Sequence, residues 1–360
     1  MTDETTNDDI QHVADEILAD SDYDTELGKR MAADARRVAD GSMSRSAFEE
    51  AYAEDVAAEF DLDITDPEAG DQMPGVISTP ESVSRRTVLK ATGAATGAAA
   101  LGAAGTTETA KAQSEGGNAV KLGMVIDTES CIKCLACVEA CKAENHTPEG
   151  TFWMQVYRYQ REDREYEDPT DCESLPRPCQ HCDDAPCVEV CPNNSRFKTE
   201  NGRVVCNYET CLGCKYCEVA CPNHVNSFAS TEPPEDLGRY DGQRRDEKGR
   251  WVAGTPPIGA SNKCSFCVQR EWDPEKRGTT ACEEACPADA IHFGDLNDPE
   301  SDPNTYLQDY DDSDTFKVRN EVTDSNVIYI GEEPEDVELE SVPGPWTHEK
   351  LGLEEPETGE

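Results

Sequence analysis

Hydrophobic positions in the first 60 residues recur every three or four residues, the spacing that puts them on one face of an α-helix. Three such stretches lie in this segment, and the spacing of Ser46 and Glu49 is that of a capping box at the start of the third. The sequence therefore predicts a small helical N-terminal appendage that ends in a linker, residues 61–80, so that the first segment is residues 1–80. The apolar positions of the three stretches are Ile10, Val13, Ile17 and Leu18; Leu27, Met31, Ala35 and Val38; and Phe48, Tyr52, Val56 and Phe60.

A different pattern begins near residue 120, where short β-type runs lead into cysteine-rich loops. The run Val125–Cys131 aligns with Val205–Cys211, 80 residues further along the chain. This repeat predicts an α+β body over residues 119–331, made of two ferredoxin-like units with short strands, Cys loops and short helices. Residues 332–360 are acidic and Pro-rich, which predicts a surface-draped or disordered tail.

Charge and composition exclude several classes of protein. The chain has 76 Asp and Glu against 32 Lys and Arg, a net charge of −44, which disfavours nucleic acid and anionic membrane surfaces as partners. Apolar residues are 36%, and no run is long and apolar enough to span a bilayer. Three explanations of this acidity compete. The carboxylates are spread along the whole chain rather than gathered in a tail, which favours a protein adapted to a salt-rich cell. The cysteines argue against the third explanation, a disordered acidic chain.

Residues 81–112 resemble a twin-arginine export signal. Arg85-Arg86 precede the uncharged run Ala91–Thr107, and Ala110-Lys111-Ala112 offers a small-x-small cleavage site. That route carries folded cargo, as metal centres inserted in the cytoplasm would require. The segment therefore predicts export to the extracytoplasmic face of the cell membrane, with an Ala/Gly-rich linker as the alternative.

The position of this signal-like segment leaves the start of the protein open. Export signals normally lie at the N-terminus, yet 84 residues precede Arg85. A start at Met73 would give a leader of ordinary length, whereas the helical periodicity of residues 8–60 favours Met1. The sequence also leaves open whether the signal is cleaved.

The 18 cysteines carry the strongest signal, because sixteen of them form four groups of four. Groups one and three have the C-x2-C-x2-C-x3-C spacing in which three thiolates on a tight loop hold three corners of a [4Fe-4S] cubane. The fourth thiolate of such a run ligates the other cluster of a pair. The groups are Cys131, Cys134, Cys137 and Cys141; Cys179, Cys182, Cys187 and Cys191; Cys211, Cys214, Cys217 and Cys221; and Cys264, Cys267, Cys282 and Cys286.

Zinc and disulfides are the competing explanations of these cysteines. Group four, and also group two, could form a zinc site, and an exported protein could hold disulfides. Zinc does not suit groups one and three, where three ligands within seven residues and an offset fourth match a cubane. Disulfides do not explain a spacing repeated four times, so we predict iron–sulfur clusters. Of the two remaining cysteines, Cys206 takes the strand place of Ile126 and is predicted to be a buried small hydrophobe. Cys172 lies outside every motif, as a free thiol or in a disulfide with Cys206.

With these four groups in this order, the body resembles the four-cluster electron-transfer subunits of the molybdopterin (dimethyl sulfoxide reductase-like) oxidoreductase family. The similarity covers residues 119–331 and rests on the runs LGMVIDTESCIKCLACVEACKAEN, NKCSFCVQR and CPADAIHFGDLNDPES. Nitrate reductase counterparts replace one cysteine by Trp and hold a three-iron cluster, whereas Cys214 keeps that place here. The resemblance therefore implies four [4Fe-4S] clusters. Lys142 follows Cys141 where other groups have Pro, a departure that relatives often share.

The resemblance also implies how the cysteines divide among the clusters, because the family pairs group one with group four and group two with group three. Lys133 and Lys215, inside the Cys loops, are either charges that raise cluster potentials or ordinary loop cations. The implied ligand sets are Cys131, Cys134, Cys137 and Cys286; Cys141, Cys264, Cys267 and Cys282; Cys179, Cys182, Cys187 and Cys221; and Cys191, Cys211, Cys214 and Cys217.

Such a subunit carries out no bond chemistry and has no catalytic residue. The resemblance implies that it relays electrons between a membrane quinone-reactive subunit and a molybdopterin catalytic subunit, without spanning the membrane itself. The equivalent iron–sulfur subunit of a nitrite reductase or hydrogenase system is an alternative in the same chemistry. A structural zinc- or disulfide-stabilised interaction protein is the alternative from another class. The sequence does not name the terminal substrate, the direction of electron flow or the cluster potentials.

Overall fold

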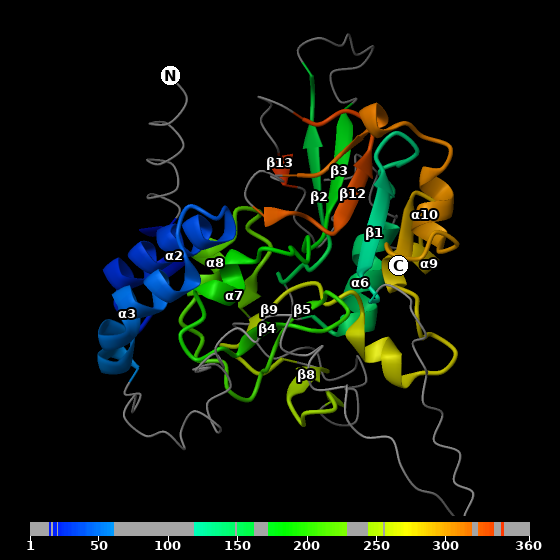
Figure 1. Ribbon diagram of the computed structural model, residues 1–360. Coiled ribbons are helices and arrows are strands. Elements are labelled where there is room, and N and C mark those ends of the chain that lie inside the picture. The colour runs from blue at the N-terminus through cyan, green and yellow to red at the C-terminus, as the bar shows by residue number, and fades with distance from the viewer. Residues whose placement is uncertain are drawn as a thin grey trace, which may run out of the picture.

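The computed structural model describes the two ends of the chain only in part (Figure 1). The predicted linker and the twin-arginine-like segment lie outside the described residues, as do Ile10 and Val13 of the first predicted helix. None of the helices within the described part is long and apolar enough to cross a membrane. The described residues are 14–15, 17–19, 21–60, 119–147, 150–161, 172–228, 244–254, 256–318, 323–334 and 340–341.

Two helices, α2 (Thr25–Ala39) and α3 (Arg45–Glu59), form where the second and third stretches of helical periodicity lie. The predicted capping box at Ser46 is wrong. Ser44 has the extended backbone of an N-cap, and its hydroxyl accepts the N–H of Ala47 at 3.2 Å. Helix α3 therefore begins one residue after Ser44, and Ser46 lies inside its first turn.

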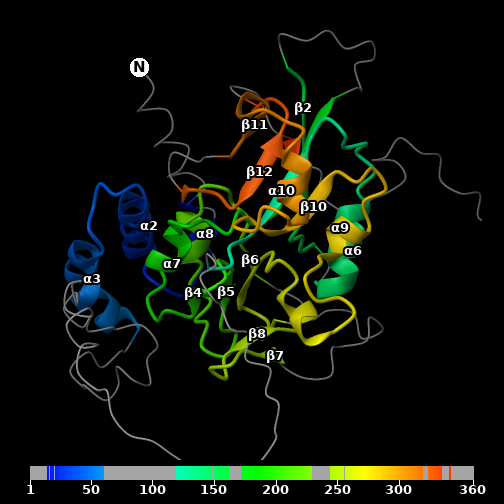
Figure 2. The same cartoon turned by 45° about the vertical axis from the view of Figure 1, so that its right-hand side comes forward.

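The helix pair shares its core with the cysteine-bearing body. Figures 1 and 2 both show α2 beside the short helices α7 (Pro186–Glu189) and α8 (Tyr216–Ala220). Two short amphipathic helices bury little apolar surface against each other, so their remaining apolar face packs on the body. The pair is thus part of one core rather than a separate appendage. Buried members of that core include Leu27, Met31, Ala35, Phe48, Tyr52, Val190, Tyr216, Val219 and Ala220.

Polar contacts hold α2 in place on α8. Arg36 donates through Nε to the carbonyl oxygen of Ala220 at 3.0 Å, at the end of α8 where carbonyls lack a partner within the helix. The Tyr216 hydroxyl donates to the carbonyl oxygen of Asp24 at 2.7 Å. Gly28 lets the two helices approach, because a Cβ there would stand 2.4 Å from ring carbon Cε1 of Tyr216.

The largest sheet has four strands in the order β10–β1–β12–β11. Strand β1 pairs antiparallel with β10 and parallel with β12, and it is buried at every position after its first residue. This sheet therefore brings together segments from both ends of the cysteine-bearing body. Its strands are β1 (Leu122–Asp127), β10 (Ile291–Asp295), β11 (Thr315–Phe316) and β12 (Val327–Ile330).

The other sheets are small. A three-stranded sheet has the order β13–β2–β3, and its strand β13 (Glu340–Ser341) belongs to the predicted tail, so that part of the tail is paired rather than disordered. The remaining strands form two-stranded ribbons, β4 with β5, β6 with β9 and β7 with β8. Their bounds are β2 (Gln155–Tyr159), β3 (Glu173–Arg177), β4 (Arg196–Lys198), β5 (Val204–Cys206), β6 (Ser227–Phe228), β7 (Arg244–Arg245), β8 (Trp251–Ala253) and β9 (Ser261–Asn262).

The two aligned sequence runs have similar local structure. Strands β1 and β5 each lead into a Cys loop that ends at a residue in the left-handed conformation, Leu135 or Lys215, before a helix. The mixture of helices and strands confirms the coarse α+β expectation. Of the two aligned strands, β1 lies in the four-stranded sheet and β5 in a two-stranded ribbon. The helices not yet named are α6 (Ala136–Asn145), α9 (Ala281–Glu284), α10 (Asp302–Leu307) and the 3-10 helices η2 (Val268–Trp272) and η3 (Asp312–Asp314).

Candidate iron–sulfur sites

The structure gathers the sixteen motif cysteines into four sets of four, the same division that the family resemblance implies. In three sets the four thiols line one cavity, and in the remaining set Cys141 lies within electrostatic reach of the other three. We number the sets as site one (Cys131, Cys134, Cys137, Cys286), site two (Cys141, Cys264, Cys267, Cys282), site three (Cys179, Cys182, Cys187, Cys221) and site four (Cys191, Cys211, Cys214, Cys217).

Strand register explains how cysteines far apart in sequence meet. Ile126, at the end of β1, pairs with Ile291, at the start of β10, so the loop after β1 lies beside the turn that precedes β10. This register brings Cys286 to the first Cys loop. The β4–β5 ribbon repeats the arrangement, because Cys206 pairs with Arg196, which brings Cys191 to the third Cys loop.

Site one opens to the surface. Cys134 is exposed, and the neighbouring side chain of Ile132 is 62% exposed. Burial, followed by repulsion from the other three thiolates of the set, raises the pKa of Cys137 to about 12. The Ala290 N–H donates to Sγ of Cys286 at 3.3 Å. The cavity has about 410 Å³ of space free of protein atoms, solvent-open space included.

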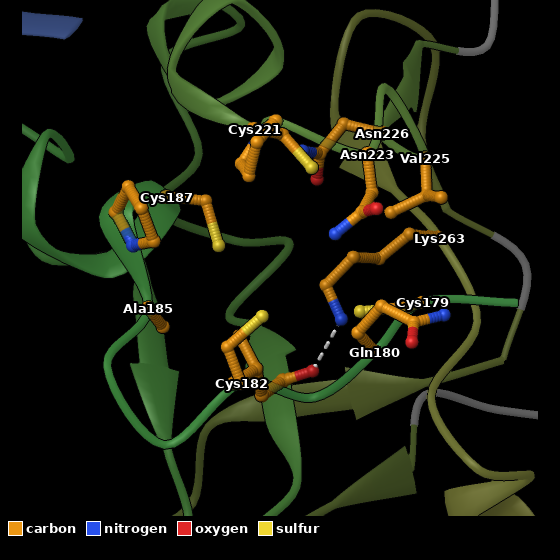
Figure 3. Close-up of a pocket in the computed structure, with 13 residues that line it drawn as sticks. Cys179, Gln180, Cys182, Ala185, Cys187, Cys221, Asn223, Val225, Asn226 and Lys263 are labelled. Atoms are coloured by element: carbon orange, nitrogen blue, oxygen red, sulfur yellow. Dashed lines mark hydrogen bonds between the residues drawn. The ribbon is translucent and has the colours of Figure 1, made fainter. Parts of the chain in front are cut away.

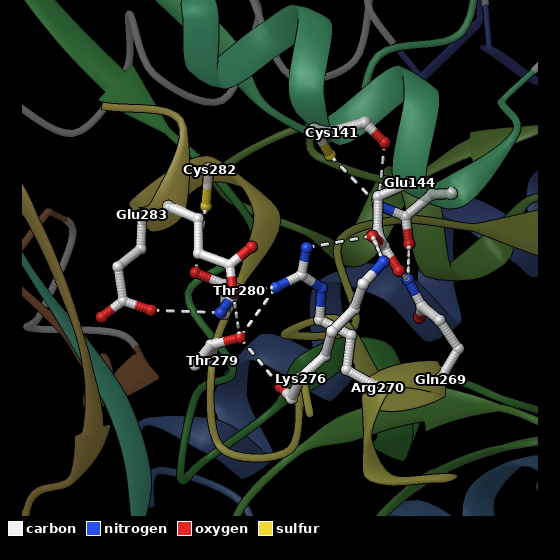
Figure 4. A network of polar contacts seen from close by, with 11 residues as sticks. Cys141, Glu144, Gln269, Arg270, Lys276, Thr279, Thr280, Cys282 and Glu283 are labelled. Atoms are coloured by element: carbon white, nitrogen blue, oxygen red, sulfur yellow. Dashed lines mark hydrogen bonds and ion pairs between the residues drawn. The ribbon is translucent and has the colours of Figure 1, made fainter. Parts of the chain in front are cut away.

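Site two is buried beneath a polar network that joins three elements (Figure 4). The side-chain amide of Asn145, on α6, donates to Sγ of Cys141 at 3.5 Å. Arg270, on η2, forms ion pairs with Glu144 on α6 at 3.0 Å and with Glu284 on α9 at 2.8 Å. Because α6, η2 and α9 carry or adjoin three of the four site-two cysteines, this network fixes their relative positions.

Site three surrounds a cavity (Figure 3). Its space free of protein atoms is about 340 Å³, solvent-open space included. The backbone N–H of His181 donates to Sγ of Cys179 at 3.4 Å. Burial raises the pKa of Cys182 to about 12, with repulsion from Cys179 as the next cause.

Site four contains a fifth thiol. Cys206 is buried in β5, as the sequence predicted, and it also lines the site-four cavity. A hydrogen bond from the Cys206 thiol is the largest cause that lowers the pKa of Cys211 to about 6. Cys206 is therefore a polar neighbour of a motif cysteine as well as a small buried residue. Cys206 is a free thiol, so it forms no disulfide with Cys172.

These sites fit anionic iron–sulfur clusters. Burial, and then the charges of neighbouring thiolates, raise the pKa values of Cys141 and Cys214 well above the ordinary thiol value. Bound iron reverses that effect, because a metal keeps its thiol ligands deprotonated. Within the described ranges, no three His, Cys, Asp or Glu side chains form a group that could hold a metal ion. In a cubane each thiolate binds a different iron, so its ligands spread more widely than those of one zinc ion.

Comparison with known proteins gives the family. Models described as the N-terminal region of 4Fe-4S ferredoxin iron–sulfur binding, a 4Fe-4S binding domain and a 4Fe-4S dicluster domain match residues 4–67, 124–144 and 170–233. A relative from Halobacterium salinarum, named as an iron–sulfur subunit of dimethyl sulfoxide reductase, is 36% identical over 243 residues, 64% of this chain and 85% of the relative. The chain belongs to the iron–sulfur subunits of the molybdopterin oxidoreductases.

Other relatives of this iron–sulfur subunit are subunits of reductases whose names give different substrates. The arsenate respiratory reductase iron–sulfur subunit of a Shewanella species is 34% identical over 204 residues, 51% of this chain and 85% of the relative. A tetrathionate reductase subunit of Salmonella typhimurium is 33% identical over 217 residues, 60% of this chain and 75% of the relative. The protein is accordingly an iron–sulfur electron-transfer component of an oxidoreductase.

Sequence reasoning about this iron–sulfur subunit missed two buried cations, Lys263 and Arg196, which line the cavities of sites three and four. The sequence pointed instead to Lys133 and Lys215. Lys133 donates its ammonium to the carbonyl oxygen of Cys172. Lys263 lies directly before Cys264 in the run NKCSFCVQR, but the sequence does not show that its charge is buried, and Arg196 looks like an ordinary strand residue.

Proposed function

We propose that the chain is a non-catalytic electron-transfer subunit that carries four [4Fe-4S] clusters, one at each site. The observation that carries this proposal is the presence of four separate four-cysteine sets within one body. When bound, each cluster takes up and releases one electron. The chain supplies the sixteen thiolate ligands, the hydrogen bonds to their sulfurs and the apolar surroundings that keep most sites away from water.

We further propose that the subunit works between a membrane quinone-reactive subunit and a molybdopterin catalytic subunit. Support comes from the family and from site one, where an exposed ligand lies beside the exposed apolar side chain of Ile132. A cluster ligand at the surface brings the redox site within reach of a partner subunit. The three relatives named above share 33–36% identity with the chain although their names give different substrates. The catalytic partner therefore selects the substrate.

Metal analysis tests the cofactor directly. Protein purified without oxygen is expected to contain about sixteen iron and as many acid-labile sulfides per chain, because four cubanes hold four of each. Iron and sulfide assays, with zinc measured in the same sample, check this. Zinc without iron would overturn the proposal in favour of a structural zinc protein. Half the expected iron would show that the chain does not hold four clusters.

We propose that a twin-arginine signal at Arg85-Arg86 exports the folded subunit to the outer face of the membrane of a halophile. Replacing both residues by Lys is expected to leave the subunit in the cytoplasm with its clusters in place, since that route depends on the arginine pair. Cell fractionation with immunodetection measures this, with replacement of the arginine pair Arg244-Arg245 on β7 by Lys as a matched control outside the segment. Unchanged export of the Arg85-Arg86 variant would rule out the route.

A further inference from the structure

Lys263 places a buried positive charge at site three. Its side chain is 4% exposed and reaches into the cavity that Cys179, Cys182, Cys187 and Cys221 surround (Figure 3). Its ammonium donates to the carbonyl oxygens of Val204 at 2.6 Å and of Cys264 at 3.1 Å. Because Cys264 belongs to site two, the charge lies between sites two and three.

Arg196 places a second buried charge at site four. Its side chain is 1% exposed, and its Nη2 lies 3.8 Å from Sγ of Cys217. Nη2 also donates to the Ser261 hydroxyl, while Nε and Nη1 are buried without a hydrogen-bond partner. Arg196 is also an electrostatic neighbour of Cys187, so its charge lies between sites three and four.

Neither cation has a carboxylate partner among the described residues, unlike two other buried arginines. Arg203 pairs with Glu271 at 2.7 Å, and Arg270 pairs with Glu144. A buried charge without a counter-charge is costly, which suggests that an anion belongs nearby. A thiolate-ligated cubane is such an anion, because its four thiolates outweigh the positive charge of its core.

Building on the proposed function, we propose that Lys263 and Arg196 are fixed positive charges that raise the reduction potentials of sites three and four above that of site one. Reduction adds a negative charge to a cluster, so a nearby buried cation stabilises the reduced form. The low dielectric of the interior strengthens this effect relative to a charge in water. Electrons that enter the subunit therefore reside on sites three and four in preference to site one.

Site one has no comparably buried cation among the described residues, because the Lys133 that lines its cavity is half-buried and donates to the carbonyl oxygen of Cys172. The strand register makes Ile291 the counterpart of Arg196, since each begins a strand five residues after the last cysteine of its group. The site-one cavity is lined there by the apolar side chains of Ile126, Val156 and Ile291. The two halves of the body are thus alike in backbone and different in buried charge.

Potentiometric titration followed by electron paramagnetic resonance tests the proposal on the cluster-loaded chain. In Lys263→Met and Arg196→Met, the equilibrium constant for one-electron reduction is expected to fall at least tenfold, about 59 mV, at site three and site four respectively. Site one is expected to change less than twofold. The charge-retaining variants Lys263→Arg and Arg196→Lys are expected to keep a reduction potential close to that of the wild-type chain. A purely structural role of the two residues would not predict this.

Lys215→Met is the matched control, because it removes one positive charge next to Cys214 from a side chain that is only half-buried. Its shift is expected to be well below that of Arg196→Met. Signals are assigned by their loss in Cys182→Ala for site three and in Cys214→Ala for site four. Equal shifts in all three Met variants, or none in a chain with full iron content, would overturn this proposal alone. A wild-type chain that binds no iron would instead overturn the proposed function.

Discussion

Replacing Cys286 by Ala is expected to abolish the four-iron signal of site one and to leave that of site two intact. Cys286 stands only four residues after Cys282, yet of the two it is Cys286 that lines the site-one cavity, and Cys282 belongs with Cys141. The register of β1 and β10 brings about this division. Iron content should fall by up to about four per chain, the content of one cubane.

Two single variants identify the lost signal. The spectrum of reduced Cys286→Ala should match that of Cys131→Ala, which removes another site-one ligand, and should differ from that of Cys264→Ala. Electron paramagnetic resonance of the three proteins, prepared side by side, makes the comparison. If Cys286→Ala matched Cys264→Ala, the four cysteines of group four would form one local site, as in a zinc ribbon, and the division into sites one and two would be wrong.

Replacing Arg270 by Met is expected to lower the free energy of unfolding by about 3–5 kcal/mol, because it leaves the buried carboxylate of Glu144 without its main partner. The two side chains are 4% and 8% exposed. Lys276 remains 3.5 Å from Glu144 but is itself half-exposed, so it compensates little. Urea unfolding measures the loss, and site two is expected to be the first to lose iron during the titration.

A second substitution separates the ion pair from simple packing. In the double variant Arg270→Met with Glu144→Met, most of the lost stability should return, because replacing a buried ion pair by apolar residues is often neutral. Arg30→Met is the matched control, since Arg30 pairs with Asp55 at 3.1 Å in an exposed position and should cost less than about 1 kcal/mol. A double variant as unstable as the single one would show that the loss comes from packing around Arg270 rather than from the broken ion pair between Arg270 and Glu144.

Local patterns in the sequence predicted local structure well and contacts less well. The run before each of the first and third cysteine groups is a strand, β1 or β5, because alternation and β-branched residues act within a few positions. The cap of α3 was misplaced because Ser44 and Ser46 are both good capping residues. The turn after α2, in which the N–H of Met43 binds the carbonyl oxygen of Arg37, favours Ser44.

The N-terminal helices show more clearly that hydrophobic periodicity predicts a helix but not the surface on which it packs. The pattern identified the apolar faces of α2 and α3, but it could not say that these faces pack on α7 and α8. The contact depends on Gly28, whose missing side chain admits the Tyr216 ring, and on Arg36, which reaches the end of α8. Both residues are separated by more than 180 positions from their partners.

The sequence by itself determined the chemistry of this protein. Three thiolates must lie on one short loop to hold a cubane, so their spacing is a local property that the chain displays directly. Only the tertiary structure decided which distant cysteine lies with each loop, through the β1–β10 and β4–β5 registers. It alone revealed the buried charges of Lys263 and Arg196, because packing between residues far apart in sequence determines whether a cation faces water or a cluster site.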